Sequence, residues 1–202
     1  RLAGRARGVA VVQRMEEPKW GTGTPHPPGP ILPEPINMIE AYDLSTGDSL
    51  CQMALPERHR LTDVSPDGTL MLSCDRDSLA DTRLDVWSIP QKRHLLGWRP
   101  SCSETRGSEY QVRWTQFVDN SRVLTFTSTG ELVLWRLPQC QAEWVLPEVA
   151  SGGTLSPGRR HVQITLRDQR SLILEAATGE VIGQLEKAVH LPYFVSAFRS
   201  DG

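Results

Sequence analysis

Apolar and polar residues alternate along most of this chain in short runs. In Arg83–Trp87 (RLDVW), for example, Leu84 and Val86 alternate with charged residues, and Glu131–Trp135 (ELVLW) has a similar pattern. A period of two is typical of a half-buried β-strand, and the runs are bounded by Gly, Pro, Asn, Asp and Ser, which favour turns. A helical period is almost absent. The pattern therefore predicts an all-β fold.

The clearest unit lies between Leu61 and Trp98, which is predicted to form four short strands with three connections. Its tightest turn is Ser65-Pro66-Asp67-Gly68. Proline presets φ for such a turn, and glycine accepts the positive φ that the turn requires. The rest of the chain resembles weaker copies of this unit.

The copies can be counted from the end of one strand in each unit. Tyr42, Trp87 and Trp135 occupy that position, and Glu175 takes it in a degenerate fourth copy, so the steps are 45, 48 and 40 residues. Repeats of about 40–45 residues that contain four strands are typical of propeller blades rather than of helical repeats.

These markers resemble the WD-repeat β-propeller family, in the degenerate form found in bacterial proteins. The turn at 65–68, the strand that ends in Trp87 and the Thr-Gly turns at 46–47 and 178–179 follow the order of that family. The resemblance implies an all-β β-propeller of four-stranded antiparallel blades, with four to five blades' worth present in an incomplete ring. The structural repeat positions that it implies are Tyr42, Pro66, Asp67, Gly68, Trp87, Trp135 and His190.

The sequence also departs from the family. The Trp-Asp pair is complete nowhere: Tyr42-Asp43 comes nearest, and Ser88 follows Trp87. The family's Gly-His is degraded, and His59 stands close to Ser65. The family's His–Ser/Thr–Asp–Trp side-chain network is therefore not predicted from this sequence.

The predicted blades span residues 1–57, 58–100, 107–147 and 148–186, with part of a fifth unit at 187–202 and a Pro-rich insertion at 16–35. A fragment of a longer propeller is expected. The alternative is that the last strand completes the first blade and closes a ring of four blades, since propellers have four to eight. The chain begins with Arg rather than Met, so its natural start is expected to lie elsewhere.

Antiparallel strands place the connections alternately on two faces of a propeller. The short turns between first and second strands and between third and fourth strands share one face, and every long connection falls on the other. Because loops on a rigid scaffold commonly bind partners, the long connections are the predicted interaction site. The candidate residues are Trp20, Pro27, Pro28, Asp75, Asp77, Asp81, Arg99 and Arg106.

Composition narrows the chemistry. The net charge of −2 creates no general attraction for nucleic acid or for an anionic membrane, and no apolar run is long enough to span a bilayer. The four cysteines are far apart, so no zinc site or other cofactor is expected. The acidic loop at 75–82 lacks the Gly and Glu of an EF-type calcium loop and is expected to be solvated. Arg159-Arg160 is likewise expected on a solvated face.

The sequence favours a non-catalytic, cytoplasmic scaffold that binds a protein, a peptide or neighbouring domains of a longer chain, and neither nucleic acid, membrane nor a small molecule is expected as partner. One alternative is a hydrolase or lactonase-type propeller enzyme with a metal in its central channel, for which the inner strands offer Asp63 and Glu109. Another is a periplasmic ligand-binding propeller. Such repeats also resemble those appended to bacterial signalling proteins.

Overall fold

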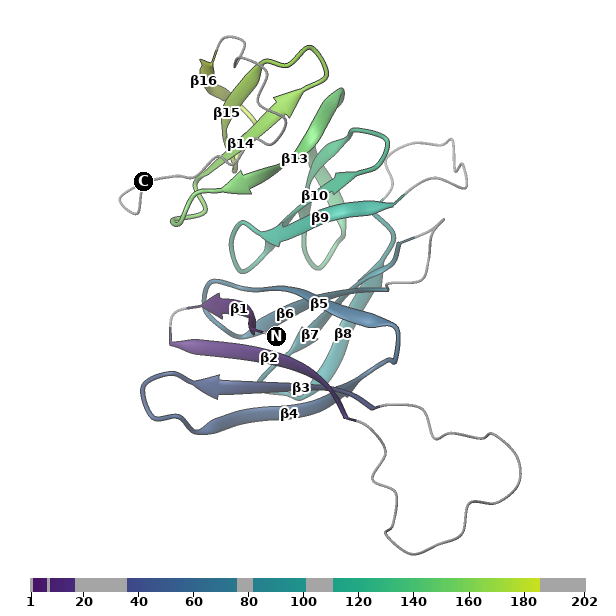
Figure 1. Ribbon diagram of the computed structural model, residues 1–202, viewed down its shortest axis with the longest axis vertical. Helices are drawn as coiled ribbons and strands as arrows, with labels where there is room; N and C mark the ends of the chain where they lie inside the picture. The colour runs from purple at the N-terminus through teal and green to yellow at the C-terminus, as the bar shows by residue number, and fades with distance from the viewer. Residues whose placement is uncertain (1, 7, 17–35, 76–81, 101–110, 186–202) are drawn as a thin grey trace, which may run out of the picture.

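The computed structural model describes residues 2–6, 8–16, 36–75, 82–100 and 111–185. All the regular structure in these ranges is β-strand, and sixteen strands form four separate four-stranded sheets. Each sheet is an antiparallel meander of consecutive strands (Figure 1). The predicted all-β fold, built from four-stranded antiparallel blades, is confirmed.

The four sheets are named blades 1 to 4 in chain order. Blade 1 contains β1 (Leu2–Ala6), β2 (Val9–Glu16), β3 (Ile36–Asp43) and β4 (Ser49–Leu55). Blade 2 contains β5 (His59–Val64), β6 (Leu70–Asp75), β7 (Leu84–Ser88) and β8 (Arg93–Trp98). Blade 3 contains β9 (Val112–Phe117), β10 (Arg122–Thr127), β11 (Leu132–Arg136) and β12 (Gln141–Leu146). Blade 4 contains β13 (Val149–Leu155), β14 (His161–Leu166), β15 (Ser171–Glu175) and β16 (Val181–Leu185).

Alternate residues of each strand face the neighbouring blade. In β3, Ile39 and Ala41 are buried, whereas Glu40 and Tyr42 between and beside them are only half-buried. Successive Cβ atoms of a strand point to opposite sides of its sheet, so this pattern places one side of blade 1 in a core. The same alternation is what identifies the strand in the sequence.

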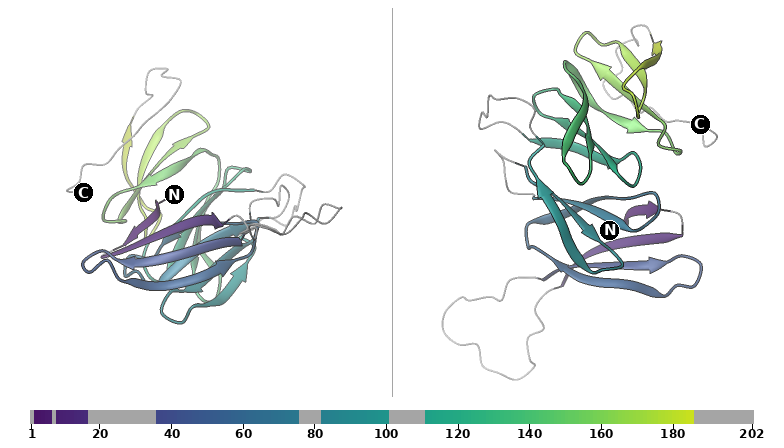
Figure 2. Two further views of the ribbon diagram at one scale, coloured as in Figure 1. Left: turned by 60° about the horizontal axis from the view of Figure 1, so that its bottom comes forward. Right: turned by 180° about the vertical axis from the view of Figure 1, so that it is seen from behind.

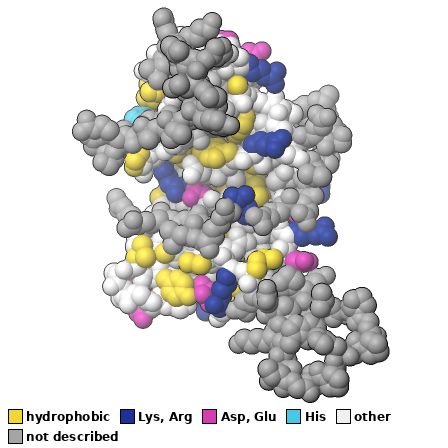
Figure 3. Space-filling model, viewed as in Figure 1, with side chains coloured by type: hydrophobic (Ala, Val, Ile, Leu, Met, Phe, Trp, Pro, Cys, Tyr) yellow, Lys and Arg dark blue, Asp and Glu magenta, His cyan; other side chains and the backbone are white. Residues whose placement is uncertain are grey.

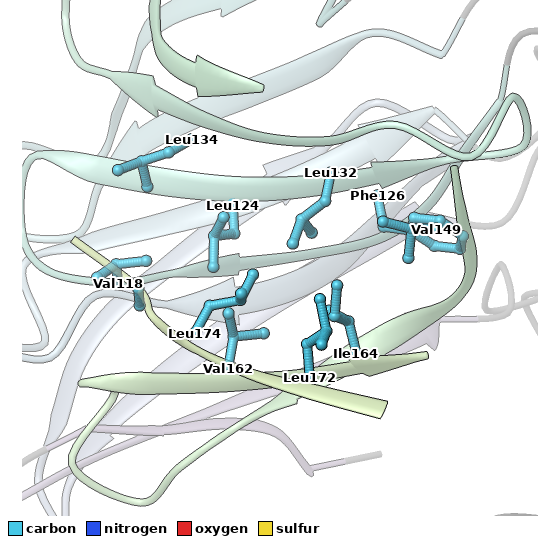
Figure 4. Packing of buried hydrophobic residues seen from close by; sticks show 11 residues of the cluster. Val118, Leu124, Phe126, Leu132, Leu134, Val149, Val162, Ile164, Leu172 and Leu174 are labelled. Atoms are coloured by element: carbon cyan, nitrogen blue, oxygen red, sulfur yellow. The ribbon is translucent and has the colours of Figure 1, made fainter. Parts of the chain in front are cut away.

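Three apolar clusters join the blades in chain order. The first joins blades 1 and 2, the second joins blades 2 and 3, and the third joins blades 3 and 4. Figure 4 shows the third cluster, in which Leu124 and Leu132 of blade 3 face Val162, Ile164 and Leu172 of blade 4. None of the three clusters of described residues joins blade 4 to blade 1, so the blades form an open arc (Figure 2).

The two tryptophans of the repeat occupy these contacts between blades. Trp135 is 5% exposed within the cluster of blades 2 and 3, and its Nε1 donates to Thr125 Oγ1 at 2.8 Å. Trp87 packs against the cluster of blades 1 and 2 and donates to Ser73 Oγ at 2.9 Å. Each tryptophan thus faces the preceding blade and bonds a hydroxyl of the strand beside it.

The connections divide the arc into two faces. We call the face with the first-to-second and third-to-fourth turns the turn face, and the face with the other connections the loop face. In the lower blades of Figure 1 the turn face lies at the left and the loop face at the right. Gly47, Gly68 and Gly179 have φ of 79°, 75° and 75°, which agrees with the turn chemistry read from the sequence.

Candidate functional site

Most of the predicted interaction residues lie outside the described residues. These are Trp20, Pro27, Pro28, Asp77, Asp81 and Arg106, and the repeat residue His190 lies outside them as well. The role of these seven positions stays a prediction. Asp75 and Arg99 are described, and the structure brings the two together.

Asp75 ends β6 and Arg99 follows β8, so both lie on the loop face. They line one cavity of about 520 Å³, which we call the outer cavity. Behind them the cavity is lined by residues of blade 2 and of the connection that enters it, namely Pro56, His59, Arg83, Asp85, Trp87 and His94.

The carboxylate of Asp85 is the centre of the outer cavity. Its side chain is 4% exposed, and Oδ1 lies 2.7 Å from His94 Nε2 and 3.1 Å from Arg83 Nε. Its Oδ2 lies 3.5 Å from His59 Nδ1. A buried carboxylate needs such partners, because desolvation of an unpaired charge is very costly. Asp85 is therefore held in place by His59 of β5, His94 of β8 and Arg83, which directly precedes β7.

A second set of hydrogen bonds links Trp87 to His59 through Ser73, whose Oγ lies 3.2 Å from His59 Nδ1. The ring of Trp87 meets His94 edge to face at 4.8 Å. Blade 2 thus contains a His–Ser–Trp chain, which the position of His59 in the sequence did not predict. Burial lowers the pKa of His59 below 6.5 and outweighs the Asp85 carboxylate, which raises it. The lowered pKa favours the neutral imidazole of His59.

A larger cavity of about 600 Å³, which we call the inner cavity, lies where β5 and β9 begin. Its lining comes from three blades and one connection: 13–15 of β2, Glu57 between β4 and β5, 59–62 of β5, Cys74 of β6, and 112–115 of β9. Both β5 and β9 start at the loop face, so the inner cavity opens on that face, beside the inner edges of the first strands.

The side-chain amide of Gln13 connects blades 1 and 2 by hydrogen bonds beside the inner cavity. Its Nε2 donates to the carbonyl of His59 at 2.8 Å, and its Oε1 accepts from the N–H of Leu61 at 3.0 Å. The side chain thereby takes the place of a neighbouring strand at the edge of β5. Asn37, which is 1% exposed, supports it by donating to the same carbonyl at 2.7 Å.

Thr115 lines the inner cavity from β9, and its hydroxyl is the notable polar group there. Thr115 is 5% exposed, and Oγ1 has no hydrogen-bond partner in the described part of the chain. Buried hydroxyls are normally paired. Arg60 and Arg113 are exposed at the cavity, and neither forms an ion pair with a described residue.

The first strands are also tied together from the turn face. Arg159, in the turn between β13 and β14, donates from Nη1 to Asp63 Oδ2 at 2.6 Å and to the carbonyl of Phe117 at 2.6 Å. Its Nη2 donates to Asp63 Oδ1 at 3.2 Å, and the N–H of Phe117 donates to Oδ2 at 2.8 Å. One side chain of blade 4 therefore joins blades 2 and 3.

This contact corrects two expectations. Arg159 was expected on a solvated face, but only 18% of its side chain is exposed, because it reaches across β9 to β5. Asp63 was the inner-strand carboxylate offered to a channel metal, but both of its oxygens already accept hydrogen bonds. Glu109, the other candidate, lies outside the described residues.

Among the described residues no group of three or more His, Cys, Asp or Glu side chains is arranged to hold a metal ion. In the same ranges no helix is long and apolar enough to cross a membrane.

Gln13, Thr115 and Arg159 are residues that sequence reasoning missed. Arg159 alone left a signal: when Ser156-Pro157-Gly158-Arg159 is aligned with the turn at 65–68, it replaces a glycine. A non-glycine residue at a position of positive φ suggests a contact that compensates for it.

No protein-family model matches this sequence, and no curated protein sequence matches it either. Solved structures do match the fold. A chain in the crystal structure of a mitotic checkpoint complex has a TM-score of 0.54 at 11% identity, over 91% of this chain and 50% of that chain. The β-propeller domain of Cps50 (Swd1) from Myceliophteria thermophila has a TM-score of 0.52 at 14% identity, over 76% of this chain and 52% of that chain.

This chain therefore spans about half the length of the two solved chains. At such low identity the likeness concerns the fold alone. Together with the four antiparallel blades and the tryptophans between them, it shows that the chain has the fold of a β-propeller segment.

Proposed function

We propose that this protein is a non-catalytic scaffold that binds a protein or peptide partner through its loop face, at the inner cavity. The observation behind the proposal is the cavity itself, about 600 Å³ in volume, to which three blades contribute. This volume is within the range of about 300–1,000 Å³ that is typical of concave ligand pockets, so it has room for side chains of a partner. A buried hydroxyl without a partner, at Thr115, lies in its lining.

The likeness to other propellers supports the proposal by analogy. One of the similar chains belongs to a structure described as a mitotic checkpoint complex, so that chain is part of a protein assembly. Fold does not determine function, and the analogy only raises the expectation of a protein partner. Neighbouring domains of a longer chain would use the same face.

Asp63 disfavours the alternative of a metal-dependent enzyme in the channel. Its carboxylate is engaged by Arg159 and by the backbone of Phe117, so a metal would have to displace an ion pair first. The bacterial type of the repeats, a cytoplasmic location and the exclusion of nucleic acid, membranes and small molecules remain predictions. No residue that lines the two cavities specifically supports the alternative of a periplasmic ligand-binding propeller.

The proposal can be tested by capturing partners from an extract of the source cells with immobilised protein. We expect Arg113→Glu, which reverses a charge at the inner cavity, to abolish capture of the specific partners. Arg93→Glu is the matched control, because Arg93 is exposed at the start of β8 on the turn face. A third variant without residues 16–35 tests whether the Pro-rich insertion contributes.

The two charge reversals should leave the fold intact, which thermal melting of each variant checks. Partners that are retained equally by wild type and Arg113→Glu, or lost only with Arg93→Glu, would contradict the proposal. Unchanged recovery after deletion of 16–35 would remove the insertion from the binding site and leave the cavity as its centre.

A further inference from the structure

We propose that the inner cavity binds an acidic peptide segment that also presents one apolar side chain. This inference rests on the proposed function, because it names the chemistry of the partner at the same site. It follows from three properties of the lining: its charge, its exposed apolar surface and its unpaired hydroxyl.

The charge of the lining is opposite to that of the whole chain. Three arginines, Arg14, Arg60 and Arg113, line the cavity together with one carboxylate, Glu57, whereas the protein has a net charge of −2. Arg14 is paired with Glu40 at 2.7 Å, but Arg60 and Arg113 have no ion pair with any described residue. On the face of the molecule drawn in Figure 3, basic and acidic side chains are interspersed.

The positive charge of Arg60 and Arg113 is therefore available to a ligand. Guanidinium groups bind carboxylates in a bidentate geometry, which gives both attraction and orientation. The two arginines come from neighbouring first strands, β5 and β9. A ligand with carboxylates at both ends of a short segment can contact both of them.

Met15 supplies the exposed apolar surface of the site. It is 54% exposed near the end of β2 and lines the cavity. Trp114 also lines the cavity, but it is half-buried and packs against the cluster of blades 3 and 4. Exposed methionine adapts to different apolar partners. An apolar side chain between the acidic residues of the ligand would pack against Met15.

The hydroxyl of Thr115 favours a ligand with hydrogen-bonding groups beyond its charges. A buried hydroxyl without a partner is unfavourable, and a ligand that reaches it gains the bond that the free protein lacks. A peptide backbone offers both a donor and an acceptor at every residue. An extended peptide is therefore a better match than a compact anion.

A nucleic acid is the competing polyanion, and the charges disfavour it. Binding to a nucleic acid backbone depends on several simultaneous phosphate contacts. Among the described lining residues only two arginines, Arg60 and Arg113, lack an ion pair, and the carboxylate of Glu57 lines the same cavity. A segment with a few carboxylates can pair with these two arginines without placing further negative charge against Glu57.

The test is selection from a displayed library of random peptides against the purified chain. We expect enrichment of peptides in which Asp or Glu residues flank one apolar residue. Binding of a synthetic enriched peptide should weaken at least about tenfold in Arg60→Glu and in Arg113→Glu. It should change only a few-fold in Arg60→Lys, which keeps the charge, and should not change in Arg93→Glu, the turn-face control.

The outcomes separate this inference from the proposed function. Enriched peptides that are neutral or basic and still depend on Arg113 would overturn the inference and leave a loop-face scaffold standing. The inference would equally be overturned if single-stranded oligo-dT bound more tightly than every enriched peptide. If no peptide is enriched and Arg113→Glu also captures all partners normally, both proposals are wrong.

Discussion

The turns between the first two strands of blades 2 and 4 have similar backbones but different residues at their third and fourth positions. In each, the N–H of the fourth residue donates to the carbonyl of the first, at 2.9 Å from Gly68 to Ser65 and at 2.8 Å from Arg159 to Ser156. The fourth residue has positive φ in both, 75° for Gly68 and 58° for Arg159. Blade 2 thus follows the local rule for glycine, and blade 4 breaks it.

The exception in blade 4 is Arg159, which bonds Asp63 across a sequence separation of 96 residues. A non-glycine residue in this conformation costs about 1–2 kcal/mol. Arg159 offsets that cost by its bonds to Asp63, to Phe117 and to the carbonyl of Val64 at 3.3 Å. The comparison of these two turns indicates that tertiary contacts can override the preference for glycine at a position of positive φ.

Among the substitutions in these two turns, Arg159→Met should cause the largest loss in the free energy of unfolding. The change keeps an unbranched side chain but leaves the carboxylate of Asp63, which is 4% exposed, without its cation. Breaking a buried ion pair by removing one partner costs about 3–5 kcal/mol, and a loss of about 3 kcal/mol is expected here because Arg159 is partly exposed. Urea denaturation measures the change in the free energy of unfolding.

Arg160→Met is the matched control, since Arg160 is the next residue and is exposed. Surface substitutions of this kind change stability by less than about 0.5 kcal/mol. Similar losses for the two variants would mean that Arg159 does not hold the blades together.

Asp63→Asn should cost somewhat less, about 2 kcal/mol. An amide has the shape of the carboxylate and can still accept a bond from Phe117, but the charge-assisted bonds from Arg159 are lost. In a double-mutant cycle, Asp63→Asn should add little to the effect of Arg159→Met. Purely additive effects would show that the two side chains stabilise the protein independently.

The sequence predicts the elements well because their determinants are local. Alternation in Arg83–Trp87 and the Pro66–Gly68 turn depends on neighbouring residues, and both recur at the blade interval. The positions of Trp87 and Trp135 between blades follow from the same register. The number of blades and the closure of the ring do not follow from such local patterns, because they depend on contacts between whole blades.

The site could not be predicted because its residues are brought together only by packing of the blades. Gln13 bonds Leu61 from 48 positions away, and Arg159 bonds Asp63 from 96 positions away. No periodicity relates these pairs. The inner cavity depends in addition on how closely β5 and β9 approach, which is set by side chains on both sides of each blade. The loop face follows from topology, but the chemistry of its cavity does not.

Gly68→Ala tests the other side of the comparison and should cost about 1–2 kcal/mol. Alanine must adopt the positive φ of 75° and has no long side chain that could compensate by reaching Asp63. Gly158→Ala in the blade 4 turn is the control, because an added Cβ there meets no atom within 4 Å and its φ is not in the left-handed region. That variant should be neutral or slightly stabilising. Equal destabilisation by both would show that backbone conformation does not explain the preference for glycine at 68.

The smallest expected difference between the two turns lies at their third residue, which is Asp67 in blade 2 and Gly158 in blade 4. Burial alone would raise the pKa of Asp67, but hydrogen bonds from Ser65 and Thr69 outweigh it and hold the pKa below 3.8. Because the pKa is lower in the folded state, the bonds stabilise the protein above pH 3.8, and this stabilisation is lost as the pH falls through the folded-state value.

Asp67→Asn should therefore destabilise the protein by less than about 1 kcal/mol at pH 7, since Asp67 is exposed and its charge is screened by solvent. The difference from the wild type should shrink as the pH is lowered through the range in which Asp67 becomes protonated, which denaturant titrations at several acidic pH values can measure. Asp168→Asn, at an exposed carboxylate in another turn of blade 4, shows how much of the trend is general. A difference that stays constant as the pH falls would mean that the negative charge of Asp67 does not contribute to the stability of its turn.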